Sequence, residues 1–284
     1  MKGRRYHFNI DRLEVCYTAS REVMDSLEDT AFWEREGYRL QEFSRDRIET
    51  TLRIDTLVPG ADGRWEVFAW LRIGNRFERE EDATRFCWIR LENKALYTKG
   101  KEYGELAYLY WIADDLGLQF NNITYLELAL DSSVNMFRRV RSALRTEGMV
   151  PIILGKAYPK MREEINKLLY IHTGDRMRYR SSTMLLKSAN DDMSLQIYDK
   201  AKEIEESGKE YIRECFGLPG SLFRMEVRLR NGALADYCTS LGCTQYDVYM
   251  RLLDGSFLFD LWLHQCDKIM RFREKRSKVS LVQL

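Results

Sequence analysis

Three short segments of the chain largely alternate between apolar and polar residues. They are residues 124–131 (TYLELALD), 195–200 (LQIYDK) and 223–230 (FRMEVRLR). Because successive side chains of a β-strand point to opposite faces, this period of two predicts three strands, each with one apolar and one polar face. Residues 183–187 predict a fourth strand, and the charged segment 201–214 predicts a helix.

The first hundred residues predict a β-rich unit. Residues 50–57 and 65–73 are β-rich and are separated by the turn sequence PGADG, which is typical of a hairpin. Residues 6–18 and 85–91 add two further strands, and residues 21–33 predict a helix.

Beyond residue 100, helices and strands are interleaved. Residues 105–116 and 134–147 place apolar side chains at helical spacing, and helices are expected to dominate from residue 234 onwards. This pattern predicts an α+β fold with a central antiparallel or mixed sheet flanked by helices. The expected division is a β-rich unit at 1–100, a catalytic α+β region at 101–232 and a helical region at 233–284, although the three could form one continuous domain.

The composition indicates the class of protein, but it does not indicate which partner the protein binds. Hydrophobic residues make up 45% of the 284 residues and charged residues 31%, which is typical of a globular protein. Since 45 Lys and Arg face 44 Asp and Glu, only local patches of charge could indicate a nucleic-acid partner. The beginning of the chain lacks the apolar region of a signal peptide, and no apolar run approaches a membrane span. We therefore expect a cytoplasmic protein without membrane contact.

The polar faces of the alternating segments carry candidate chemistry. Tyr198 and Lys200 share one face of residues 195–200. Glu127 and Asp131 share one face of residues 124–131, about 13 Å apart along the strand. Asp131, at the carboxyl end of that strand, is the better candidate ligand. Residues 223–230 place Glu226 among arginines on a face that we expect to be exposed.

Attack on a phosphodiester is the chemistry that suits these residue types. A tyrosine hydroxyl can act as a nucleophile, and a divalent metal held by carboxylates can polarise the phosphate. Arginines can clamp phosphate oxygens bidentately. Two simpler interpretations stay open, because Tyr198 could be a half-buried strand aromatic and Glu226 part of a surface salt-bridge ladder.

The order and spacing of YLELALDSS, IYDKAKEIEES and FRMEVRLRN resemble those of the trans-acting replication initiators of rolling-circle plasmids and related phage elements. The resemblance covers residues 125–231, and the opening NIDRLEVCYT is similar to the first strand of that family. It implies a mobile-element protein that nicks one DNA strand at an origin through a tyrosine. The tyrosine stays linked to the 5′ phosphate, and the freed 3′ hydroxyl primes synthesis.

The same resemblance implies roles for individual residues. Tyr198 is expected to be the nucleophile with Lys200 beside it, Asp131 and Glu226 to bind Mg²⁺ or Mn²⁺, and Glu127 to support these ligands without binding the ion. The side chains expected to contact DNA are Arg224, Arg228, Arg230 and Lys187.

The chain departs from the family pattern in one position. Many relatives carry a second tyrosine in the strand before IYDK, where this chain has Leu185. Tyr170 and Tyr179 lie upstream and are alternative nucleophiles. His7, His172 and His264 are far apart in the sequence, so a histidine-bound metal is not expected.

The expected partner is origin DNA in a single-stranded or hairpin region, with a host helicase or polymerase and a second copy of the chain as further candidates. Basic segments at 156–167 and 175–182 could follow a DNA backbone or simply be solvated surface. The basic segment 267–278 could be a phosphate-binding tail or the frayed end of a helix. The alternative function is an origin-binding initiator that recruits host replication enzymes and cuts nothing. A metal-dependent nuclease that uses water and a structural protein of a mobile element are further rivals.

Overall fold

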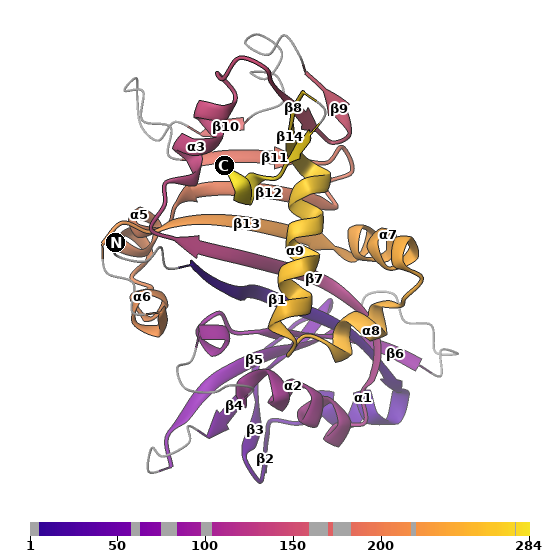
Figure 1. Ribbon diagram of the computed structural model, residues 1–284. Coiled ribbons are helices and arrows are strands. Elements are labelled where there is room, and N and C mark those ends of the chain that lie inside the picture. Colours follow the sequence, from indigo (N-terminus) through magenta and orange to yellow (C-terminus); the bar gives the residue numbers. More distant parts are fainter. Residues whose placement is uncertain are drawn as a thin grey trace. The chain divides into compact units, whose positions relative to one another are not determined.

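The predicted α+β class is confirmed by the computed structural model, which describes residues 6–57, 63–74, 84–97, 104–158, 170–172, 183–216, 220–275 and 277–284. Long antiparallel strands carry helices packed against them (Figure 1). None of the helices in these ranges combines the length and the apolar character that crossing a membrane requires.

Contacts divide the chain into two compact units, each assembled from separate segments. Unit 1 comprises Met1–Ile10, Glu127–Ala233 and Asp254–Leu284, and unit 2 comprises Asp11–Leu126 and Leu234–Leu253. These units group the chain differently from the expected division at residues 100 and 232. That division stays a prediction.

Unit 2 contains a twisted antiparallel sheet in the order β1-β6-β5-β4-β3-β2. Apolar side chains on one face of this sheet are fully buried, among them Leu40, Leu52 and Leu71. Helix α2 packs on this face, where the Trp111 ring meets Tyr38 and the Tyr108 ring meets Phe68 (Figure 1). The elements are β1 (Tyr6–Ser20, which begins in unit 1), α1 (Arg21–Glu28), β2 (Phe32–Arg35), β3 (Tyr38–Arg45), β4 (Glu49–Leu57), β5 (Trp65–Gly74), β6 (Thr84–Leu91), η1 (Lys94–Tyr97), α2 (Gly104–Asp115), α7 (Asn231–Leu241, which also begins in unit 1) and α8 (Gln245–Met250).

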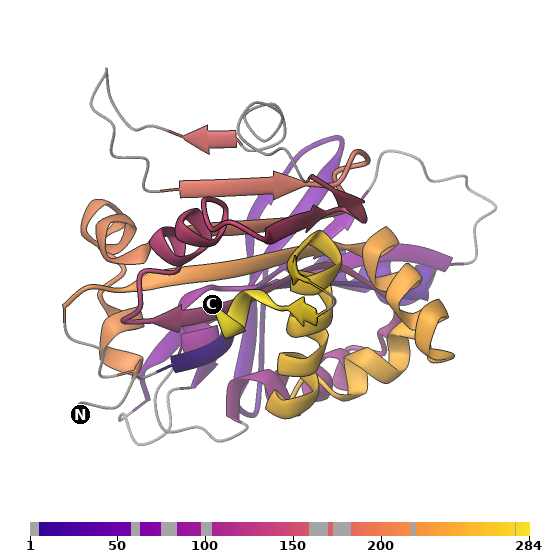
Figure 2. The same cartoon turned by 45° about the horizontal axis from the view of Figure 1, so that its top comes forward.

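Unit 1 contains strands in the order β10-β11-β12-β13-β7 and a smaller sheet in the order β15-β14-β8-β9. Helix α9 crosses the apolar face of the larger sheet and buries Leu258, Leu261 and Trp262 there (Figure 1, Figure 2). The elements are β7 (Gln119–Ser132, which begins in unit 2), α3 (Met136–Ala143), β8 (Met149–Ile153), β9 (Lys156–Ala157), β10 (Tyr170–His172), β11 (Thr183–Lys187), β12 (Met193–Asp199), α5 (Lys200–Ser207), α6 (Tyr211–Phe216), β13 (Phe223–Arg230), α9 (Gly255–Ile269), β14 (Met270–Glu274), β15 (Ser277–Val279) and η2 (Leu281–Gln283).

Several predicted elements end in a different place. The helix predicted at 21–33 stops at Glu28, and Phe32–Arg35 forms β2 against β3, a strand that the sequence pattern did not indicate. The helix predicted at 201–214 is divided at Gly208, whose φ of 71° ends α5 in the left-handed conformation that glycine tolerates.

The carboxyl-terminal region is not wholly helical. Residues 267–278 had been expected to form a helix end or a basic tail. Instead, β14 and β15 pair as a hairpin, and Phe272 is fully buried. The alternation of Met270 and Phe272 with arginines is the period-two signal that the helical interpretation missed.

Candidate active site

Strand register in unit 1 brings the predicted site residues together. In the antiparallel pair β12–β13, Tyr198 lies opposite Arg224 and Gln196 opposite Glu226. Strand β7, which carries Glu127 and Asp131, is the other neighbour of β13. Side chains paired in this way share one face of a sheet. We call the six side chains Glu127, Asp131, Tyr198, Arg224, Glu226 and Arg228 the acid–tyrosine cluster.

Tyr198 is hydrogen-bonded to a buried carboxylate. Its hydroxyl donates to Oε2 of Glu226 over 3.0 Å. The tyrosine is half-buried, whereas Glu226 is only 1% exposed. A phenol that donates to a carboxylate has a proton acceptor in place, which is the arrangement that an oxygen nucleophile requires.

Asp131 is held by a buried arginine. Both of its carboxylate oxygens accept a hydrogen bond of 2.7 Å from Arg224, from Nε and Nη2. The side chains of Arg224 and Asp131 are 0% and 1% exposed, and Nη1 of Arg224 lies 3.8 Å from Oε2 of Glu226. Arg224 therefore connects the two carboxylates that were expected to bind a metal together. These contacts favour a role for Asp131 in positioning Arg224.

Arg228 bridges the other two carboxylates. Its Nε lies 2.8 Å from Oε1 of Glu226 and 3.0 Å from Oε1 of Glu127. Its side chain is 37% exposed, while Glu127 is buried like Glu226. The guanidinium that neutralises this carboxylate pair thus lies on the solvent side of the cluster.

The Glu127–Glu226 pair has the donor set of a hard-cation site. A carboxylate oxygen of each residue lies within 4.8 Å of one on the other, and both side chains are buried. Mg²⁺ and Mn²⁺ prefer such oxygen ligands, and bonds of about 2.1 Å would draw the two oxygens slightly closer than that limit. The residues therefore fit a divalent ion between Glu127 and Glu226.

Lys200 lies beside Tyr198, although the predicted strand is one residue too long. Strand β12 ends at Asp199, whose side chain caps α5 by accepting a hydrogen bond from the backbone N–H of Lys202. Lys200 opens that helix, is buried, and pairs with Glu203. Its Nζ is 5.7 Å from the centre of the Tyr198 ring, so its positive charge lies close to the phenol.

The expected DNA contacts divide into one buried side chain and three that reach solvent. Arg224 is completely buried against Asp131, and its assignment as a DNA contact is therefore corrected to an internal ion pair. Arg228, Arg230 and Lys187 reach solvent, and the last two both lie close to Asp191, at 3.6 Å and 3.0 Å. The hydrogen bond from Lys187 lowers the pKa of Asp191.

The structure says less about the two alternative nucleophiles, Tyr170 and Tyr179, than about Tyr198. The backbone of Tyr170 pairs with Leu185, on the strand next to the one that carries Tyr198. Tyr179 and most of the basic segments 156–167 and 175–182 lie outside the described residues. Alternation identified the polar face, but it carried no signal that this face would be buried.

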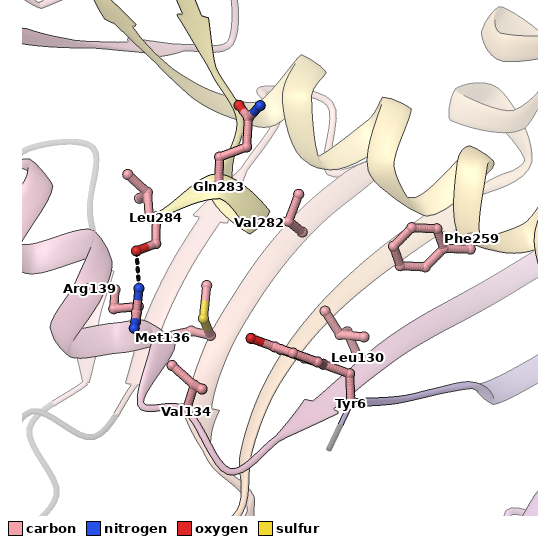
Figure 3. A pocket seen from close by; sticks show the side chains of 9 residues that line it. All are labelled: Tyr6, Leu130, Val134, Met136, Arg139, Phe259, Val282, Gln283 and Leu284. Atoms are coloured by element: carbon pink, nitrogen blue, oxygen red, sulfur yellow. Dashed lines mark hydrogen bonds between the residues drawn. The ribbon is translucent and has the colours of Figure 1, made fainter. Parts of the chain in front are cut away.

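A separate cavity lies on the helical side of the same sheet. It has a volume of about 330 Å³, and Figure 3 shows Leu130 and Phe259 among its largely apolar lining. Arg139 is at one end, donating a hydrogen bond to the backbone oxygen of Leu284. Because Leu130 and Asp131 are adjacent on β7, they point to opposite faces, so this cavity is not part of the acid–tyrosine cluster.

Comparison with known proteins assigns no family to the chain. No family model matches the sequence, and no curated protein matches it.

Proposed function

We propose that the protein is a replication initiator that nicks one DNA strand at an origin, with Tyr198 as the nucleophile. The hydrogen bond from the Tyr198 hydroxyl to buried Glu226 carries this proposal. The ordered resemblance of residues 125–231 to rolling-circle initiators supports it.

The reaction is a transesterification in which the chain supplies the nucleophile and the base. The Tyr198 oxygen attacks the phosphorus, its proton passes to Glu226, and a phosphotyrosine bond to the 5′ side forms as the bond to the 3′ oxygen breaks. The departing 3′ oxygen takes a proton from solvent. Arg228, which is half-exposed, can turn from the carboxylates to the phosphate as the DNA arrives.

Glu127 and Glu226 would hold a divalent cation. When bound, it would offset the negative charge of the phosphate. Asp131 then contributes indirectly, because it holds Arg224 against Glu226 and so fixes the carboxylate that receives the tyrosine proton.

The test is incubation of the protein with supercoiled DNA carrying its own origin and Mg²⁺ or Mn²⁺, followed by SDS treatment. We expect nicked DNA with a 5′ end that stays attached to protein. Tyr198→Phe should lose both the nick and the attachment by at least about 10³-fold, because it removes the oxygen that attacks the phosphorus.

Tyr6→Phe is the matched control, since Tyr6 is a half-exposed tyrosine of unit 1 that lies at the separate cavity. Tyr170→Phe and Tyr179→Phe test the alternative nucleophiles. If Tyr198→Phe still forms the covalent product and one of these does not, the assignment of Tyr198 is wrong. If Tyr198→Phe supports replication in cells, the initiator acts by binding alone.

A further inference from the structure

One face of the sheet in unit 2 carries aromatic and arginine side chains. The opposite face holds the buried core, and α2 lies over that face (Figure 1). We call the face that carries Arg53, Trp70, Arg72, Phe86, Trp88 and Arg90 the outer face.

Four aromatic rings form a track across the outer face. Phe43 lies at a bulge in β3 and meets Trp70 on β5 with ring centres 4.8 Å apart. Trp70 pairs with Arg90, so Trp88, two residues before Arg90 on β6, is the diagonal neighbour of Trp70, about 7–8 Å away. Phe86 continues the track on β6, at the next position of the same face.

The rings at both ends of this track are open to solvent. Phe43 is 65% exposed and Phe86 49% exposed, which is unusual for side chains of this size. Gly74 lies under Trp88, because a Cβ at Gly74 would be 3.3 Å from that ring. The absent side chain lets the indole lie close to the backbone, as a flat surface for stacking.

Arginines flank the rings in register. Trp70 lies between Arg53 on β4 and Arg90 on β6, and Arg72 lies opposite Trp88. Arg53 pairs with Asp55, and Arg72 with Glu14 and Glu49, whereas exposed Arg90 has no ion-pair partner among the described residues. The three arginines of this face are thus matched by three carboxylates, so the face offers a ligand aromatic surface and little or no net positive charge.

We infer that the outer face of unit 2 is a binding platform for single-stranded DNA. Exposed rings spaced along a sheet can stack on successive bases, and arginines between them can contact the phosphates. A duplex keeps its bases stacked on each other and cannot use the rings, so the face fits a single strand. The choice of DNA over RNA rests on the proposed function, but the platform itself uses none of the residues of the acid–tyrosine cluster.

The weak net charge makes a quantitative expectation possible. With at most three phosphates contacted by arginine, the slope of log K against log salt should be about −2, because each phosphate contributes about −0.7 for a single strand. A surface that binds through charge alone would give a steeper slope, and loss of a ring would not weaken it.

Fluorescence anisotropy with labelled (dT)20, (rU)20 and a 20-base-pair duplex tests this inference. Phe86→Ala and Trp88→Ala should each weaken (dT)20 binding roughly five- to 100-fold, as expected for the loss of one base–ring stack. Arg90→Ala should weaken binding less and reduce the salt slope by about 0.7. Phe86 and Arg90 are exposed, so these variants keep the fold even if Trp88→Ala does not, and a thermal melt verifies this.

Tyr246→Ala and Arg138→Ala are matched controls, since they remove an exposed ring on α8 and an exposed arginine on α3, and neither helix contributes a side chain to the outer face. Both should bind (dT)20 like the parent protein. Unchanged binding by both Phe86→Ala and Arg90→Ala would overturn the platform, and so would tighter binding of the duplex than of (dT)20. Equal or tighter binding of (rU)20 would overturn the assignment to DNA.

The two proposals fail separately. If the platform is wrong, the outer-face variants bind like the parent while Tyr198→Phe still abolishes the covalent product. If the nicking proposal is wrong, no covalent product forms, yet Phe86→Ala still weakens binding.

Discussion

The acid–tyrosine cluster of unit 1 and the outer face of unit 2 both arise from strands that alternate apolar and polar residues, but they differ in burial. In the cluster, Asp131, Arg224 and Glu226 are at most 1% exposed, and each charge is met by an opposite charge within 4 Å. On the outer face, Phe43 and Phe86 are largely exposed and Arg90 has no ion-pair partner in the described ranges.

This difference follows from the cost of removing charge from water. A buried charge requires a partner and defined geometry, whereas an exposed arginine keeps its hydration and can remain available. A buried polar network is therefore suited to holding a nucleophile and a metal in place. An exposed, ring-rich face is suited to a ligand that arrives from solution.

The largest effect should come from breaking the buried pair. Arg224→Ala leaves Asp131 buried without its bidentate partner, which should cost about 3–5 kcal/mol of unfolding free energy and lower Tm by roughly 6–15 °C. A thermal melt measures this change. The exposed Lys187→Ala is the control, and its pair with Asp191 should contribute no more than about 1 kcal/mol. If Arg224→Ala lowers the unfolding free energy by less than about 1 kcal/mol, the ion pair with Asp131 does not behave as a buried one.

Metal binding should stabilise the parent protein through Glu226. At Mn²⁺ concentrations of about 100 times Kd the gain should approach about 2.7 kcal/mol, and Glu226→Gln or Glu127→Gln should remove most of the accompanying rise in Tm. Glu66→Gln, at a partly exposed glutamate that pairs with Arg64 and Lys94 in unit 2, should keep it. An equal Mn²⁺ shift in all three variants would place the metal elsewhere.

The aromatic rings and charged side chains of the outer face should contribute little to the unfolding free energy. Arg90→Ala and Phe86→Ala should each change the unfolding free energy by no more than about 0.5 kcal/mol, because both side chains are exposed. Urea denaturation provides the measurement. A decrease in unfolding free energy of more than about 2 kcal/mol would mean that these side chains pack as part of the core. The contrast with the acid–tyrosine cluster would then be weaker.

The smallest effect is a pH dependence that lies outside both regions. Burial, with smaller contributions from Lys268 and Lys278, lowers the pKa of His264 from its ordinary value of 6.5. The unfolded chain therefore binds more protons near pH 6, so stability should decrease as the pH falls through 6.5. His264→Gln should make the dependence of Tm on pH shallower between 5.5 and 7.5. An unchanged slope would assign the acid sensitivity to carboxylates instead.

The sequence predicted much of the fold where side-chain alternation decided it. The ranges 183–187 and 223–230 are strands β11 and β13, and Tyr198 and Glu226 lie on one face as the pattern indicated. Burial could not be predicted in the same way, because it depends on what covers a face. Arg224 was therefore assigned to DNA although it is internal.

The misplaced helix boundaries have a local cause. Gly208 adopts a left-handed conformation that ends α5, yet the residues around it continue to favour a helix. The hairpin at 270–279 was missed because its strands are short, and short alternating segments compete poorly with a preceding helical pattern. The outer face was not recognised either, because its members come from different strands whose register includes bulges that alternation does not reveal.

Tyr198 is the last residue but one of a strand that is paired on both sides, with Thr183 and with Arg224. The backbone that carries this phenol is held by strand pairing on both sides, so a nucleic acid joined to the phenol would stay at a fixed position on the protein. The carboxylate that takes the proton during cleavage would then be available to return it during the reverse step. On the proposed mechanism, the same rigid arrangement that cuts a strand would reseal it once a free 3′ hydroxyl reaches that point, making the protein a strand-rejoining agent as well.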